Sequence, residues 1–276
     1  MNLLTGRYWP VGFFLLLFAH SGHLVAASLY GTQQPALAIV IDDMGKRLST
    51  GRRVVSLPGP IACSFLPHAR HSRYLAEQAH KQGKEVLLHL PMESIDQRPL
   101  DAGGMFLDMT RSEFIHTLRK DMDAVPYLSG INNHMGSLLT RHPGHMAWLM
   151  QELQRVGKLY FVDSRTTSAT VARTIAREWG VPNSQRNVFL DNINQSEAIS
   201  RQVDKLVASA KKHGTALAIG HPYRTTLNVL KKMLPQLSAR GVRLVPVSEL
   251  IRIQKEDSPW QASLFPSPRA AKNSKP

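Results

Sequence analysis

The sequence lacks several features that would narrow its class at once. It contains one cysteine in 276 residues, Cys63, so an intramolecular disulfide is excluded. Cys63 lies in a strand-like apolar run, where a small buried residue is expected more often than a catalytic thiol. No strand-like segment opens a GxGxxG loop, and no P-loop motif occurs. The sequence therefore gives no sign of a dinucleotide or nucleoside triphosphate site.

Acidic residues are also scarce, because 20 Asp and Glu face 34 Lys and Arg, for a formal net charge of +14. Nucleic acid is the usual partner of so basic a chain. The basic residues are scattered, however, and the N-terminus predicts export, so we expect no nucleic-acid partner. Anionic glycans, phospholipid headgroups or an acidic protein remain open as partners.

The N-terminus carries an apolar run that is too short to span a bilayer comfortably. Arg7 precedes this run, residues 10–18, and Val25-x-Ala27 has the small-residue pattern of a signal-peptidase site. We interpret residues 1–27 as a secretory signal peptide, with an uncleaved anchor as the alternative. A periplasmic protein with no stable membrane span after cleavage is expected.

The remainder of the chain divides by composition. Residues 28–35 form a short polar lead, and residues 256–276, with several Pro, Ser and Lys, are expected to be a disordered tail. Between them, residues 36–255 repeat a strand-like run, a short turn and a helix about seven times. This rhythm predicts parallel strands in right-handed βαβ units. A (β/α) barrel, complete or incomplete, fits it better than a doubly wound sheet.

The first of these runs, ALAIVIDDMG at 36–45, ends in two carboxylates, Asp42 and Asp43. Successive side chains of a strand point to opposite faces, so the two aspartates are expected to point in different directions. One could then hold a metal while the other handles a proton. An isolated Asp pair would more often cap the segment that follows it.

Further polar residues follow other strand-like runs, and in a parallel barrel these ends share one face. Two neutral imidazoles and a carboxylate suit Zn²⁺ or a similar divalent cation. The residues concerned are Asp42, Asp43, His89, His134, Asp163 and His221.

Roles follow from this clustering. Asp43, His89 and His134 are the first-choice metal ligands, with Glu93 as an extra ligand or a group that supports them. A hydrolytic reaction at such a metal also needs a base for the water and an acid for the leaving group.

Asp42 is the candidate base and His221 the candidate acid, and Asp163 completes the catalytic candidates. Tyr223 and Arg224 could orient His221 or contact substrate, and surface roles are as plausible for both.

Five segments together resemble the divergent polysaccharide deacetylases, relatives of the NodB-type carbohydrate esterases. The resemblance implies a distorted (β/α)₇ barrel, a divalent metal with zinc as the expected ion, and hydrolysis of an N- or O-acetyl group on a sugar. It also implies that Asp42 is the base and Asp43 a metal ligand. The segments are IDDMG at 41–45, LLHLPME at 87–93, GINNHMGS at 130–137, FVDSRT at 161–166 and AIGHPY at 218–223.

The chain departs from the NodB-type pattern at three places. Glu93 stands where a second histidine of His-x-x-x-His is usual, and residues 132–134 (NNH) replace Arg-x-Pro-Tyr. The segment at 163–165 is not Asp-x-x-Asp-Trp, which leaves open the residue that tunes the acid histidine.

Two functions are therefore expected from the sequence. The first is an exported metal-dependent hydrolase that removes acetyl groups from an envelope or other polysaccharide. The alternative is a catalytically weak or inactive barrel that acts as an envelope glycan- or protein-binding factor, which would add an envelope protein as partner.

Overall fold

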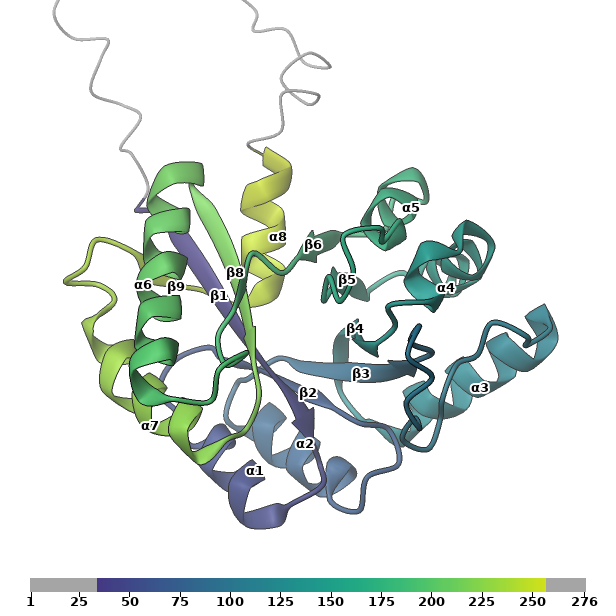
Figure 1. Cartoon of the computed structure of the whole chain (residues 1–276), viewed down its shortest axis with the longest axis horizontal. Helices are drawn as coiled ribbons and strands as arrows, with labels where there is room; N and C mark the ends of the chain where they lie inside the picture. Colours follow the sequence, from purple (N-terminus) through teal and green to yellow (C-terminus); the bar gives the residue numbers. More distant parts are fainter. Residues whose placement is uncertain (1–33, 257–276) are drawn as a thin grey trace, which may run out of the picture. The chain divides into compact units, whose positions relative to one another are not determined.

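A curved sheet organises residues 34–256, the part of the chain that the computed structural model describes (Figure 1). The strand order is β6-β5-β4-β3-β2-β1-β8-β7, with β9 pairing to β1, and every pairing is parallel. The strands are β1 (Ala36–Met44), β2 (Ala62–Phe65), β3 (Val86–Met92), β4 (Leu128–Met135), β5 (Tyr160–Asp163), β6 (Asn183–Gln185), β7 (Val188–Phe189), β8 (Thr215–Gly220) and β9 (Arg243–Leu244).

The sheet curls into a half-barrel that does not close. Its end strands, β6 and β7, follow each other in the chain but do not pair within residues 34–256. This confirms the predicted distorted (β/α) barrel and shows that the barrel is incomplete. Two elements, the three-residue strand β6 and the last helix, are not predicted from the apolar runs.

Helices follow the strands in the order that the sequence predicts. Thr110 closes a capping box with Glu113 and thereby starts α3, and Gly157 ends α4 in a left-handed conformation. The helices are α1 (Leu48–Val55), α2 (Ser72–Lys81), α3 (Arg111–Ala124), α4 (Pro143–Val156), α5 (Ala172–Glu178), α6 (Ser196–His213), α7 (Arg224–Met233) and α8 (Val247–Glu256), with 3₁₀ turns η1 (Leu139–Arg141) and η2 (Leu234–Gln236).

Two apolar clusters occupy the two faces of the sheet. Leu37, Ile39 and Ile41 of β1 belong to the larger cluster, which includes buried residues of α1 to α7. The alternate residues of β1 belong to the smaller cluster, together with Leu250 and Ile251 of α8. Helix α8 therefore packs on the inner face of the half-barrel, opposite the surrounding helices.

None of the helices within residues 34–256 is long and apolar enough to cross a membrane. The predicted signal peptide at 1–27, residues 28–33 of the polar lead and the predicted tail beyond Glu256 lie outside the described residues.

Candidate metal centre and catalytic site

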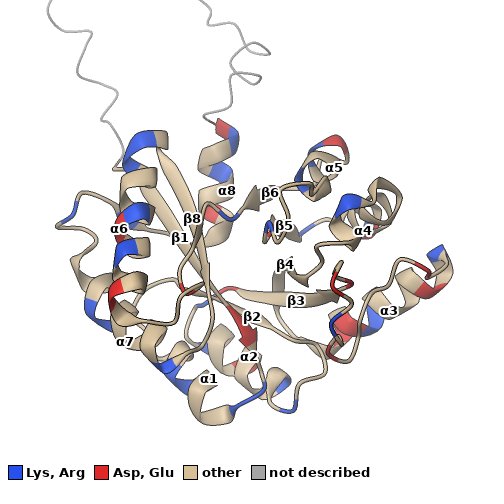
Figure 2. Ribbon diagram, viewed as in Figure 1, with Lys and Arg blue, Asp and Glu red and all other residues tan. Residues whose placement is uncertain are grey.

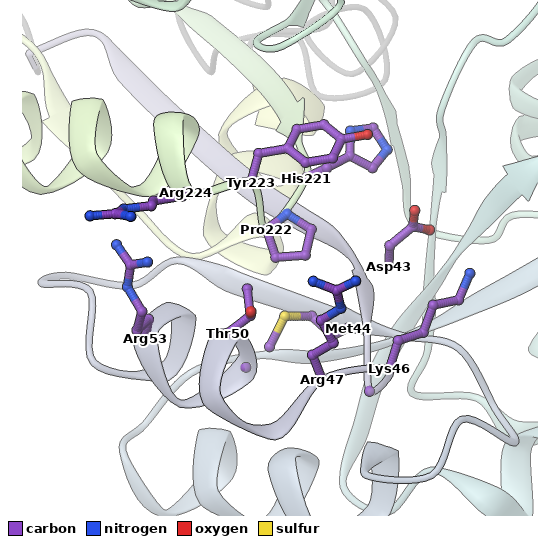
Figure 3. A pocket seen from close by; sticks show the side chains of 12 residues that line it. Asp43, Met44, Lys46, Arg47, Thr50, Arg53, His221, Pro222, Tyr223 and Arg224 are labelled. Carbon is purple, nitrogen blue, oxygen red and sulfur yellow. The ribbon is translucent and has the colours of Figure 1, made fainter. Parts of the chain in front are cut away.

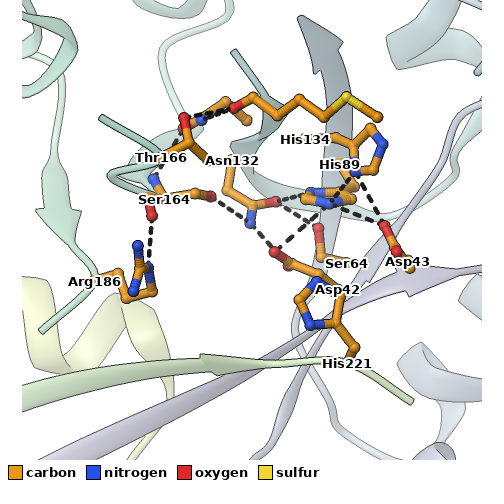
Figure 4. A network of polar contacts seen from close by, with 12 residues as sticks. Asp42, Asp43, Ser64, His89, Asn132, His134, Ser164, Thr166, Arg186 and His221 are labelled. Atoms are coloured by element: carbon orange, nitrogen blue, oxygen red, sulfur yellow. Dashed lines mark hydrogen bonds and ion pairs between the residues drawn. The ribbon is translucent and has the colours of Figure 1, made fainter. Parts of the chain in front are cut away.

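The inner face of the half-barrel changes from apolar to polar toward the carboxyl ends of its strands. In β1 the inner residues Ala36, Ala38 and Val40 lead to Asp42, which is 3% exposed. The same alternation in the other strands leads to Ser64, His89, Asn132, His134, Ser164 and His221. These side chains form the polar network drawn in Figure 4.

Asp43 reaches this network in spite of the strand alternation, which would turn it toward the outer helices. Its φ is +53°, in the left-handed region, and the pairing of β1 with β2 shifts register between Ile41 and Met44. The bulge brings both carboxylates close to His89 Nε2, at 3.6 Å from Asp42 Oδ2 and 3.4 Å from Asp43 Oδ1. The expectation that the two aspartates point in different directions is thus corrected.

Three donor atoms converge at this bulge. His134 Nδ1 lies 3.1 Å from Asp43 Oδ1 and 3.1 Å from His89 Nε2, and His89 Nε2 lies 3.4 Å from Asp43 Oδ1. A tetrahedral site with bonds of about 2.0–2.1 Å separates its ligand atoms by about 3.3 Å. Asp43 Oδ1 is also buried without a hydrogen bond among the described residues. The donor set therefore fits a small divalent cation.

The contacts between Asp43 and the imidazoles also affect the charge of the carboxylate. Burial by itself would raise the pKa of Asp43, but the imidazoles of His134 and His89 hold it well below its usual range. Burial would lower the pKa of His89, and the carboxylates of Asp42 and Asp43 outweigh that effect and raise it. The carboxylate of Asp43 is thus ionised and available to a cation.

Asn132 connects the metal donors to the candidate base. Its side-chain amide donates to Asp42 Oδ1 at 2.8 Å and to Ser164 Oγ at 3.2 Å. Its carbonyl oxygen accepts from Ser64 Oγ at 2.5 Å and from His89 Nδ1 at 3.0 Å. Because His89 donates through Nδ1, Nε2 is the nitrogen that offers a lone pair to a metal when the ring is neutral.

Asp42 itself is held in a buried position by the hydrogen bond from the Asn132 amide. Burial raises the pKa of its carboxyl, and the charges of His89 and His221 and the hydrogen bond from Asn132 oppose the rise. Since Oδ1 accepts from Asn132, Oδ2 remains to receive a proton. The arrangement matches the predicted role of a base.

Glu93 is not brought into the donor group. Its Oε2 accepts from the Leu107 backbone N–H at 2.8 Å, and its own N–H donates to the Met105 carbonyl. The carboxylate thus fastens the far end of the 94–109 loop, instead of serving as the extra ligand that the sequence suggests.

The 94–109 loop extends to the metal donors through Asp101. Asp101 Oδ2 lies 3.5 Å from His134 Nε2 and 3.1 Å from Lys46 Nζ, on the connection after β1. The carboxylate faces the imidazole nitrogen on the side away from Asp43. His134 Nε2 makes no hydrogen bond among the described residues, so Asp101 contacts this imidazole without fixing its tautomer.

His221 is oriented by Asp191, which the sequence analysis did not select. Asp191 Oδ1 accepts from His221 Nδ1 at 2.9 Å, while its Oδ2 accepts from the His221 backbone N–H and from Thr226 Oγ1. Burial would lower the pKa of His221, but Asp191 and the charge of Asp42 raise it to about 9. His221 is therefore protonated at neutral pH, as an acid must be.

Asp163 does not join the site. It shares the outer face of β5 with Phe161, and its carboxylate accepts from the Arg165 backbone N–H at 2.8 Å and from Thr170 Oγ1 at 2.9 Å. These contacts order the turn before α5. The structure thus gives Asp163 a role in the turn, and Asp191 the place beside His221.

The comparisons with known proteins agree with the motifs. The family described as divergent polysaccharide deacetylase matches residues 39–251. This chain belongs to that family. The uncharacterized protein YibQ of Escherichia coli (strain K12) is 37% identical over 239 residues, which cover 85% of this chain and 74% of YibQ.

Two solved structures of other proteins share the fold. The uncharacterized protein ATU2773 from Agrobacterium tumefaciens C58 matches with a TM-score of 0.75 and 21% identity, over 80% of this chain and 90% of that one. The peptidoglycan deacetylase PdaC from Bacillus subtilis matches with a TM-score of 0.52 and 13% identity, over 84% of this chain and 98% of its own. The half-barrel is thus of the NodB type.

In this member of the divergent polysaccharide deacetylases, an arginine enters the network from an unpredicted place. Arg186, between β6 and β7, donates to the backbone oxygens of Ser164 and Arg165 at 2.6 and 2.7 Å, and its guanidinium lies over the ring of Phe189. Burial lowers the pKa of Arg186, and the negative charge of Asp42 opposes this. Hydrogen bonds through Ser164 and Asn132 thus connect Arg186 to Asp42, the candidate base.

Replacing Asn132 tests how the donors are held. In Asn132→Ala, His89 loses the acceptor that fixes its tautomer, so we expect divalent-metal affinity to fall about 10- to 100-fold. Titration of zinc against a chromophoric chelator measures this affinity. The exposed Asn194→Ala serves as control and should bind as the wild type does. Unchanged affinity in Asn132→Ala would contradict the assignment.

Proposed function

We propose that this divergent polysaccharide deacetylase is a metal-dependent hydrolase that removes acetyl groups from a polysaccharide of the cell envelope. The observation that carries the proposal is the convergence of Asp43 Oδ1, His89 Nε2 and His134 Nδ1 within 3.4 Å of one another, beside Asp42. Such a set leaves open positions for water and substrate.

A divalent cation, with zinc the proposed ion, would be held by these three donors and would polarise the acetyl carbonyl and lower the pKa of the attacking water. The chain's own residues then handle the protons. Asp42 accepts the proton of the water at Oδ2, since Oδ1 is held by the Asn132 amide. Asn132 fixes the direction of that carboxylate.

His221 supplies the proton for the leaving group. Its Nδ1–H donates to Asp191, so the ring is fixed and Nε2–H remains to protonate the sugar nitrogen or oxygen as the acetyl group departs. Hydrolysis of an amide or ester requires both a base and an acid, and Asp42 and His221 supply them beside the donor set.

Two further features support the substrate class and the compartment. The chain shares its fold with PdaC, a protein named as a peptidoglycan deacetylase. We therefore propose a related kind of glycan as the substrate of this chain. The apolar run at 10–18 and the small residues at 25–27 support export to the periplasm.

Acetate release tests the proposal. The zinc-loaded mature protein is expected to release acetate from peptidoglycan or acetylated oligosaccharides, and Asp42→Asn should lower kcat about 10²- to 10⁴-fold because the base is lost. Asp123→Asn, an exposed isosteric change on α3, should keep the rate. Glycan binding with no acetate release from any of these polymers would instead support the binding-factor alternative.

The pH dependence tests the role of Asp191. Because the pKa of His221 is about 9 and its protonated form is required, kcat/KM should fall as the pH rises through about 9. Asp191→Asn removes the charge that raises this pKa, so the falling limb should move to lower pH. Asp163→Asn should leave the position of the limb unchanged. A limb that does not move in Asp191→Asn would exclude His221 as the acid.

A further inference from the structure

A cavity of about 370 Å³ opens beside Asp43 and His221, between the β1–α1 and β8–α7 connections (Figure 3). Figure 2 shows basic residues over α1 and α7 around the end of β1, where the paired aspartates lie. The basic side chains that line the cavity are Lys46, Arg47, Arg53 and Arg224.

Charge in the cavity is unbalanced. Asp43 is the one carboxylate among its described lining residues, and its oxygen belongs to the metal donor set. Lys46 pairs with Asp101 at 3.1 Å, and Arg53 donates to the neutral side chain of Asn228 at 3.0 Å. The side chains of Arg47 and Arg224 make no hydrogen bond or ion pair within residues 34–256. Figure 3 shows the guanidinium groups of Arg53 and Arg224 at the same end of the cavity.

Like charges gathered in this way repel one another, and an anion between them would relieve the repulsion. Guanidinium groups match the geometry of carboxylate and phosphate oxygens better than that of neutral hydroxyl groups. The backbone adds potential of the same sign, because α1 and α7 both begin at the cavity with no acidic residue in the first turn and no side-chain cap.

Tyr223 marks where a sugar ring would lie. Its side chain is 45% exposed, and its ring centroid is 5.7 Å from that of His221. Aromatic faces of this kind offer an apolar surface with a polar tip. A sugar against Tyr223 would present one end to His221 and the other to the arginines.

We propose that this cavity binds an anionic substituent of the glycan, a carboxylate or a phosphate, so that the preferred substrate is an acidic polysaccharide. The inference rests on the proposed function, because it names the substrate class of the same site. Arg47, Arg53 and Arg224 act as specificity residues that hold the anion while the acetyl group lies between Asp42 and His221.

Binding to matched ligands tests the inference without turnover. Calorimetry on zinc-loaded Asp42→Asn would compare an N-acetylglucosaminyl-N-acetylmuramic acid tetrasaccharide with its methyl ester, in which the carboxylate is neutral. A second pair compares 6-phosphorylated with plain chitotetraose. In at least one pair the anionic form should bind roughly tenfold tighter, and the pair that shows it distinguishes carboxylate from phosphate.

The variants then locate the effect. Adding Arg47→Gln and Arg224→Gln should remove most of the preference, and the fold should tolerate both changes because neither side chain has a partner among the described residues. Adding Arg201→Gln and Lys205→Gln removes the same charge from the exposed face of α6 and should keep the preference. Equal affinity within both pairs, or a preference that survives Arg47→Gln with Arg224→Gln, would overturn the inference.

Failure here is separable from failure of the proposed function. If acetate is released equally well from plain and anionic oligosaccharides, the deacetylase assignment holds and the anionic preference is overturned. If the charged ligands bind more tightly but no acetate is released, the preference holds and the assignment fails.

Discussion

The left-handed backbone at Asp43 is the constraint on which the site depends. With regular alternation, β1 would present Asp42 to the inside of the half-barrel and Asp43 to the helices outside. The bulge returns Asp43 to the inside, so that the proposed base, Asp42, and the proposed metal ligand, Asp43, both lie within 3.6 Å of His89 Nε2. Such a conformation costs about 1–3 kcal/mol. The pairing of β1 with both β2 and β8 holds it in place.

Much of this site could be predicted from the sequence, because parallel strands bring their carboxyl ends to one edge. Position at the end of a strand predicts Asp42, His89, His134 and His221. Strand parity, the odd or even position that decides which face of the sheet a side chain takes, separates inner from outer residues, which the apolar runs alone do not do. Asp163 shares the outer face with Phe161, so parity argues against it. The strand end and the family resemblance predict Asp43 as a metal ligand, but the bulge that turns it to the inner face is not predicted by any residue pattern.

Two site residues that were not predicted follow strands too short to show a clear sequence pattern. Asp191 follows β7, a strand of two residues, and Arg186 follows β6, a strand of three. Neither strand is long enough to show a period. The importance of Asn132 depends on contacts at both ends of its amide, to Asp42 and to His89, which only the folded chain brings together. Parity places Asn132 on the inner face but assigns it no role.

The central claim is that Asp43, His89 and His134 are one metal centre built by this bulge. Anomalous diffraction from crystals of the mature protein grown with zinc tests it most directly. One strong peak is expected about 2.0–2.1 Å from Asp43 Oδ1, His89 Nε2 and His134 Nδ1 together. A peak held by other residues, or crystals that take up no ion when zinc is in excess, would contradict it.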